Sequence, residues 1–212
     1  MKSQGPFEAK PRLPIIDELI STVLSQHTSD INTERAFGAL KARYRTWDEV
    51  IDVATDELAD TIRAGGLGDQ KAPRIQAILR TIWERENRLD LSRLNGLGDQ
   101  EVDDYLQSLP GVGPKTAACV LAFSMGRNAF PVDTHVHRVS RRLGLIDEKA
   151  SADVASRILA PRVPPDIRYE LHMAFIDHGR KICVARLPRC SRCVLFDLCP
   201  DGPKLVAAGV AR

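Results

Sequence analysis

Lys115 and Asp133 are the two residues in this chain of 212 whose types and spacing best suit covalent chemistry. Lys115 follows the turn-forming run LPGVGP at 109–114, in what the sequence indicates is the first turn of a helix. A cation is disfavoured at that end of a helix dipole, and an uncharged lysine amine is a nucleophile. Asp133 follows one helix later, and a hairpin in the chain would bring its carboxylate back beside the amine. The pair therefore predicts catalysis by an amine that a carboxylate assists.

The hairpin before Lys115 has the composition of a phosphate-binding turn. Gly111 and Gly113, on either side of Val112, have no Cβ, so the backbone can turn tightly and approach another molecule closely. Pro114 suits the first position of a helix, where unpaired N–H groups attract a phosphate oxygen. From the residues alone two simpler interpretations stay open: the lysine only contacts phosphate, and the aspartate only caps a helix.

Four of the five cysteines lie close together near the end of the sequence, in the pattern C-x6-C-x2-C-x5-C. Four thiolates in one short segment can hold an iron–sulfur cluster or a tetrahedral zinc ion, and either would stabilise that segment. Zinc sites usually offer two close cysteine pairs, whereas only one is present here, so the iron–sulfur cluster is favoured. The predicted ligands are Cys183, Cys190, Cys193 and Cys199, while Cys119 lies in an apolar run and is expected in the core.

These features together resemble one protein family. Residues 109–117 resemble the helix-hairpin-helix motif of the DNA glycosylase superfamily, and residues 132–135 resemble its catalytic-aspartate segment. A lysine in the hairpin marks the bifunctional members, of which endonuclease III is the type. The cysteine pattern is also similar to the cluster loop of the endonuclease III family, which implies a [4Fe-4S] cofactor.

The resemblance implies a base-excision-repair enzyme that is both a DNA glycosylase and an AP lyase on oxidised pyrimidines. The damaged base would leave the duplex, because its reactive atoms cannot be reached in the stack. Lys115 would attack the sugar C1′, displace the base and form a Schiff base, and β-elimination would cut the strand 3′ to the lesion. Asp133 would stabilise positive charge on the sugar or accept the lysine proton. The implied partner is double-stranded DNA with damaged bases or abasic sites, bound by a monomer.

Contacts to the DNA backbone are expected from the hairpin and from the cysteine-rich segment. Residues 111–113 and Lys115 would hold the phosphates next to the lesion without reading sequence. Arg186 and Arg189 lie between the first two cysteines and would meet phosphates, and the alternative is a solvated charged loop.

The resemblance further implies two residues that fill the space of the flipped nucleotide. The candidates are Gln26 or His27, in the segment after Leu24, and Leu67 in a glycine-containing loop. Glutamine is usual at the position of His27, and the loop lacks the aromatic residue that often follows the leucine. These departures leave the substrate range open, and His27 is equally well explained as a surface or capping histidine.

Two other functions remain open. The first is a mismatch-specific glycosylase, although the adenine-removing type ordinarily lacks the hairpin lysine. The second is a non-catalytic damage-binding homologue that kept the fold, against which Lys115 and Asp133 argue.

Composition supports an ordinary globular protein rather than a membrane protein or a strongly basic DNA-coating protein. Hydrophobic residues make up 43%, charged residues 27%, and the formal net charge is +2. No apolar run is long enough to span a bilayer and no signal segment opens the chain. We therefore expect a cytoplasmic protein, nucleoid-associated if bacterial.

The pattern of apolar residues predicts an all-α fold of many short helices. Helices are expected over 14–24, from a cap at Asn32 or Thr33, over 55–62 with Thr55 as cap, and along an apolar face that ends at Trp83. The resemblance implies two helical lobes with the active site in the cleft between them. Residues 21–130 would form the continuous helix-hairpin-helix domain, and 1–20 plus 131–212 the discontinuous cluster domain.

Overall fold

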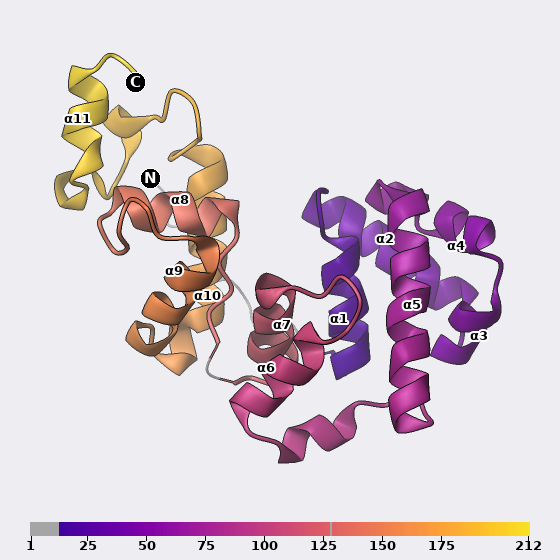
Figure 1. The fold of residues 1–212 in the computed structure, drawn as a ribbon. Coiled ribbons are helices and arrows are strands. Elements are labelled where there is room, and N and C mark those ends of the chain that lie inside the picture. The colour runs from indigo at the N-terminus through magenta and orange to yellow at the C-terminus, as the bar shows by residue number, and fades with distance from the viewer. Residues whose placement is uncertain (1–12, 128) are drawn as a thin grey trace. The chain divides into compact units, whose positions relative to one another are not determined.

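The computed structural model describes residues 13–127 and 129–212, which form helices joined by turns with no β-strand among them (Figure 1). The predicted all-α class is thereby confirmed. Within these residues, no helix combines the length and apolar character that crossing a bilayer requires. The described residues fall into two compact units, 13–127 and 129–212.

The first unit is built around α5 (Gly68–Glu86), the long helix in Figure 1, against which the shorter α3 (Trp47–Asp52) and α4 (Thr55–Thr61) pack. Its apolar residues recur at helical spacing, so one continuous face of the helix is buried. The other helices of this unit are α1 (Ile15–Leu24), α2 (Asp30–Arg43), α3 (Trp47–Asp52), α4 (Thr55–Thr61), α6 (Asp99–Gln107) and α7 (Pro114–Cys119), and a π-helical turn at Val120–Ser124 continues α7.

The first helix corrects the expected domain boundary. Leu19, Ile20 and Val23 form an apolar face on α1 that is wholly buried, and α1 packs against α2, α5 and α7. This burial places residues 13–20 with the first unit rather than with the C-terminal segment. Residues 1–12 of the expected 1–20 segment lie outside the described residues.

Two helix starts also differ from expectation. Ser29, rather than Asn32 or Thr33, caps α2, because its hydroxyl accepts a hydrogen bond from the Asn32 N–H. Thr55 begins α4 but does not cap it, since its hydroxyl donates to Gln76 Oε1 at 2.7 Å. A tertiary contact thus replaces the local one.

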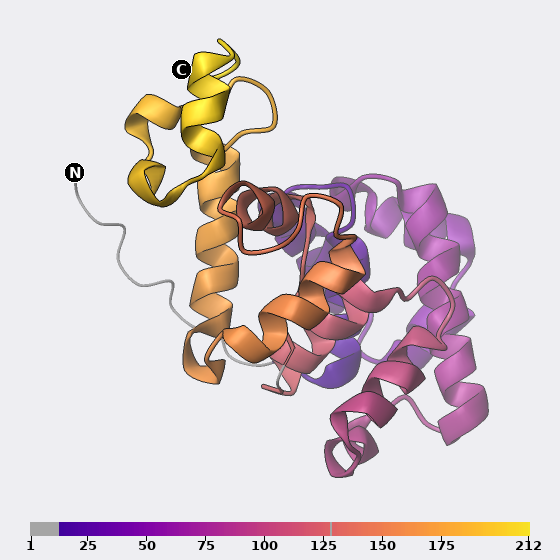
Figure 2. The same cartoon turned by 60° about the vertical axis from the view of Figure 1, so that its left-hand side comes forward.

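The second unit packs α8 (Thr134–Arg142) against α10 (Arg168–Lys181), with α9 (Ala152–Leu159) in contact with α8 (Figure 2). Phe130, Val136 and Leu159 lie in its hydrophobic core. After α10 come two short 3₁₀ turns, Cys190–Arg192 and Phe196–Leu198, and then α11 (Asp201–Ala207).

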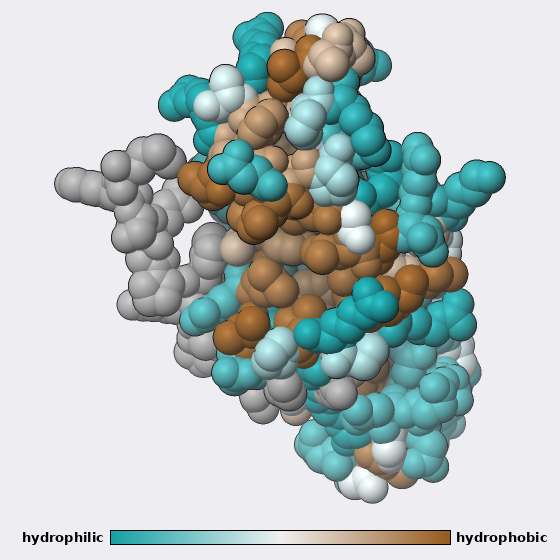
Figure 3. Space-filling view, turned by 90° about the vertical axis from the view of Figure 1, so that its left-hand side faces the viewer, coloured by the Kyte–Doolittle hydropathy of each residue, from teal (hydrophilic) through white to brown (hydrophobic). Residues whose placement is uncertain are grey.

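The surface of this second unit carries apolar side chains as well as charged ones. Val194 and Leu198 expose 75% and 76% of their surface. Figure 3 shows hydrophobic side chains gathered on one face of the molecule and bordered by hydrophilic ones.

Candidate active site and cysteine-lined cavity

The hairpin between α6 and α7 turns at Gly111, whose φ of +70° lies in the left-handed region. A Cβ there would lie 2.8 Å from Nε of Arg74, a residue of α5. A side chain at this position would therefore be both strained and obstructed. The turn is closed by the Val112 N–H, which donates to the Leu109 carbonyl at 3.1 Å.

The start of α7 leaves the lysine on an uncapped helix end. Gly113 precedes α7 in an extended conformation, and no side chain caps the helix. The amides of Thr116 and Ala117 both donate to the Gly113 carbonyl at 3.0 Å, and Pro114 has no N–H. Lys115 is half-buried in this first turn.

A carboxylate that sequence reasoning missed lies within electrostatic reach of the same lysine. Glu18 on α1 accepts a hydrogen bond from the Thr22 hydroxyl at 3.2 Å. Burial raises the pKa of Glu18 above its ordinary value, while the Thr22 hydrogen bond and the charge of Lys115 lower it by less. The sequence signal was an acidic residue amid the apolar positions of a helix.

Asp133 caps α8 in the second unit. Its Oδ1 accepts hydrogen bonds from the N–H groups of His135 at 2.8 Å and Val136 at 2.7 Å. The helix-cap interpretation is therefore confirmed as a structural role. It occupies one carboxylate oxygen, and none of the described residues donates to the other, so capping and catalysis are compatible.

The segment before Asp133 is held by two hydrogen bonds to its backbone. The Phe130 carbonyl accepts from the Ser156 hydroxyl at 2.8 Å, and the Pro131 carbonyl lies 3.0 Å from Nδ1 of the buried His172. These contacts fix the backbone that leads into the cap of α8.

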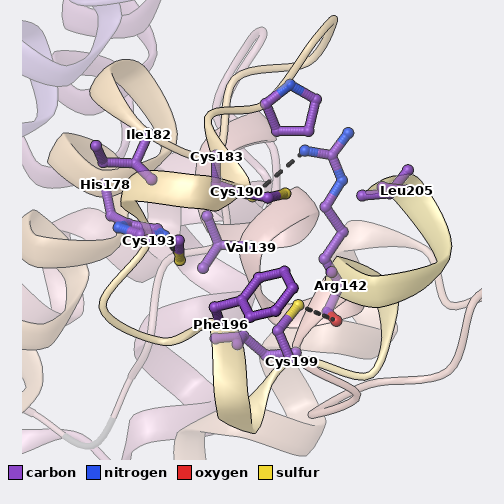
Figure 4. A pocket seen from close by; sticks show the side chains of 13 residues that line it. Val139, Arg142, His178, Ile182, Cys183, Cys190, Cys193, Phe196, Cys199 and Leu205 are labelled. Atoms are coloured by element: carbon purple, nitrogen blue, oxygen red, sulfur yellow. Dashed lines mark hydrogen bonds between the residues drawn. The ribbon is translucent and has the colours of Figure 1, made fainter. Parts of the chain in front are cut away.

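The four clustered cysteines line one cavity of the second unit, with an empty volume of about 390 Å³ including its opening (Figure 4). Val139, Ile182, Phe196 and Leu205 supply much of the apolar lining. Cys119 is buried in the first unit, as the sequence predicted for a core residue. The four thiols named by the spacing are therefore the four that the fold brings together.

Arg142 of α8 forms hydrogen bonds with two of the cysteines and with the backbone of the loop that follows α10. Its Nη1 donates to Cys183 Sγ at 3.3 Å and to the Val184 carbonyl at 2.9 Å, and the Cys199 thiol donates to the Arg142 carbonyl at 3.2 Å (Figure 4). Burial, followed by the neighbouring thiols, raises the pKa of Cys190. Four crowded thiolates would thus repel one another unless a positive group lay among them.

The four thiols border one common space rather than converging on a single point. No three His, Cys, Asp or Glu side chains of residues 13–127 and 129–212 come close enough together to share one metal ion. All four cysteines nevertheless face the same cavity.

The two arginines between the first cysteines are exposed. Arg186 precedes Leu187, whose φ of +52° turns the loop sharply, and the Arg189 N–H anchors the loop by donating to the Ile182 carbonyl at 2.9 Å. The anchored loop presents both guanidinium groups to solvent.

The residues that are candidates for filling the space left by the flipped nucleotide differ in their contacts and exposure. Gln26 is half-buried: its Oε1 accepts from Arg74 Nη1 at 2.9 Å, and its Nε2 lies 3.5 Å from Thr116 Oγ1. His27 is exposed at φ +55°, and Leu67 is 44% exposed at φ +53°. Left-handed backbone costs about 1–3 kcal/mol outside glycine and is concentrated at functional sites.

Comparison with known proteins agrees with this geometry. Residues 20–165 match the HhH-GPD superfamily of base excision DNA repair proteins. The chain is 37% identical over 181 residues to endonuclease III of Thermotoga maritima, with 85% of this chain and 80% of that protein covered. It is 38% identical over 169 residues to a candidate DNA glycosylase of Arabidopsis thaliana; the match covers 80% of this chain but only 57% of the plant protein.

Solved structures of DNA glycosylases are also similar to this chain. Endonuclease III in a non-covalent complex with DNA superposes with a TM-score of 0.79 at 32% identity, over 96% of this chain and 91% of that one. A thermostable thymine-DNA glycosylase shares the fold, with a TM-score of 0.74 at 21% identity.

Proposed function

The chain belongs to the HhH-GPD superfamily of base excision DNA repair proteins, as an endonuclease III-like DNA glycosylase and AP lyase, and on that premise we propose that it removes oxidised pyrimidines from double-stranded DNA and cuts the strand through a Schiff base on Lys115. The observation that carries the proposal is the lysine itself, half-buried in the uncapped first turn of α7 directly after the glycine turn.

Lys115 supplies the nucleophile in this proposal. Its uncharged amine forms a bond to C1′ as the bond between C1′ and the base breaks, and the base leaves with the electron pair and takes up a proton. The C1′–O4′ bond then breaks, O4′ keeps the electron pair and takes up the proton that the amine has lost, and the resulting iminium between Nζ and C1′ acidifies the C2′ proton. Loss of that proton forms the C2′–C3′ double bond and expels the 3′ phosphate, and hydrolysis then frees the lysine.

Asp133 acts on charge rather than by covalent attack. Its Oδ1 remains the cap of α8. Its other oxygen stabilises the positive charge that develops on the sugar or accepts a proton from the lysine. Because the cap fixes the carboxylate, little reorganisation accompanies the reaction.

Two sets of residues bind damaged DNA in this proposal: one contacts the phosphate backbone, and the other fills the space that the flipped nucleotide leaves in the base stack. The hairpin backbone at 111–113 and the exposed Arg186 and Arg189 contact phosphates. His27 and Leu67 fill this space, since both side chains are exposed and both residues have left-handed backbone. Gln26 does not, because Arg74 holds its side chain by a hydrogen bond.

The four cysteines hold a [4Fe-4S] cluster in this proposal. Their shared cavity and their spacing, which contains only one close cysteine pair, both favour a cluster over zinc. The cluster supplies thiolate–metal bonds that stabilise the loop carrying Arg186 and Arg189.

Substrate specificity is tested with a panel of duplexes that each hold one oxidised pyrimidine, one T·G or A·G mismatch, one abasic site or no lesion. We expect excision and strand cleavage with the oxidised pyrimidines, cleavage of the abasic duplex, and no release from the mismatches. Release of thymine or adenine from a mismatch, with oxidised pyrimidines left intact, would overturn the assigned substrate class.

A further inference from the structure

Lys71, in the second turn of α5, is a buried cation that the chemistry above does not use. The residue is only 3% exposed, and its Nζ donates to the Leu24 carbonyl at 2.7 Å and to the Gly65 carbonyl at 2.8 Å. No carboxylate in the part of the chain that the structure describes forms an ion pair with it. Burial lowers the pKa of Lys71, which is the cost of placing an ammonium there.

The two carbonyls that receive this ammonium stand directly before the two strained loops. Leu24 ends α1, and His27 follows three residues later at φ +55°. Gly65 ends a short 3₁₀ turn, and Leu67 follows two residues later at φ +53°. The Lys71 Nζ therefore binds the backbone carbonyl that lies just before each loop.

Strained conformations persist only where surrounding contacts hold them. Without the ammonium, these two buried carbonyl oxygens would lose their donor, and each unsatisfied acceptor is costly. The side chain of Lys71 reaches both carbonyls from α5, whose apolar face is buried in the core of the unit. It thereby ties both loops to the rigid part of the first unit.

We propose that Lys71 is a positioning residue: its two hydrogen bonds hold the His27 loop and the Leu67 loop at a fixed separation, so that both side chains enter the duplex together at the lesion. This inference rests on the function proposed above. It assigns Lys71 to the opening of the damaged site in DNA and not to bond breaking.

Lys71→Met is the first test, because methionine keeps an unbranched side chain but cannot donate. Misplacing a reacting group by about 1 Å can cost on the order of 100-fold, so we expect single-turnover excision from duplex DNA to fall by roughly 10- to 100-fold. The fluorescence rise of a 2-aminopurine placed beside the lesion, which reports unstacking, should slow in parallel. Lys71→Arg keeps the charge and the donors and should recover most of both signals.

A double-mutant cycle separates positioning from general stability. In a background of His27→Ala and Leu67→Ala, Lys71→Met should cause little further loss, because the side chains through which it acts are gone. Additive losses would overturn the proposal. If Lys71→Met does not fold, Lys71→Gln takes its place in the same cycle.

Gln76→Met is the matched control on the same helix. Gln76 is also buried, and its Nε2 donates to the carbonyls of Val50 and Val53 at 3.1 and 2.7 Å, away from both loops. It should lose thermal stability while its 2-aminopurine signal stays normal well below the unfolding temperature. An equal slowing in both variants would mean that Lys71 is merely structural.

The wild-type protein must first excise a lesion and be trapped by borohydride. If it does neither, the proposed function fails and Lys71 has no loops to position. If it does both and the cycle is additive, only the role of Lys71 is refuted.

Discussion

Glu18 places an acid in the electrostatic environment of Lys115. Because burial raises its folded-state pKa, the folded protein binds this proton more tightly than the unfolded chain does. Stability from this residue is therefore present below the ordinary pKa of about 4.5 and is lost as the pH rises through the folded value. The residue thus lowers stability at neutral pH, which is typical of a functional site.

Glu18→Gln should remove that penalty while keeping a hydrogen-bond acceptor for Thr22. We expect the variant to gain stability over the wild type at pH 7 and to gain less at pH 4, where the wild-type carboxyl is largely protonated in both states. Urea unfolding at the two pH values measures this difference. An identical difference at both values would contradict the raised pKa.

At the scale of elements, the sequence predicted features that depend on neighbours in the chain. The four cysteines lie within seventeen residues, so their spacing alone indicated a shared site, and the glycine turn before Lys115 was equally local. The apolar period of α5 was correct along most of its length, but Trp83 at its end is 44% exposed.

Features set by contacts between distant elements could not be predicted in this way. Lys71 looks like an ordinary exposed helix lysine, and only the fold brings the Leu24 and Gly65 carbonyls to it. Thr55 was predicted as a cap because nothing local reveals Gln76 as its partner. The location of α1 was missed for the same reason: its apolar face does not say which unit it packs against.

The cysteine segment gives a prediction at this scale. If a cluster fills the cavity, the purified protein should be brown with broad absorbance near ~400 nm, and Cys190→Ser should lose colour and stability together because cluster binding is coupled to folding. Iron, sulfide and zinc analysis with thermal unfolding checks this. Stoichiometric zinc without iron or sulfide, after anaerobic purification, would refute the cluster.

The loop between the first two cysteines gives another. Arg186→Ala and Arg189→Ala should weaken binding to damaged and undamaged duplexes alike, because phosphate contacts carry no sequence information. Each should reduce the slope of log affinity against log salt concentration by about one. Titrations at several salt concentrations measure the slope, and an unchanged slope in both variants would mean that the loop is only solvated.

For the whole molecule, the residues of the proposed reaction are divided between the two units. The first holds Lys115, the hairpin and the loops of His27 and Leu67, and the second holds Asp133 and the cysteine cavity.

Asp133→Asn should therefore keep a trappable amine but slow base excision by ~10²–10⁴-fold, the usual contribution of such a side chain. Preformed abasic DNA needs no base removal, so the loss there should be smaller. Equal losses on both substrates would refute this division of roles.

Covalent trapping tests the amine most directly. Wild-type protein, Lys115→Gln and Asp133→Asn are each incubated with an abasic duplex and borohydride, and binding is measured in parallel without the reductant. Lys115→Gln should retain abasic-site binding through the hairpin backbone and form no covalent adduct, while the other two proteins are trapped. Undiminished trapping of Lys115→Gln would show that another amine is the nucleophile and that the hairpin only holds phosphate.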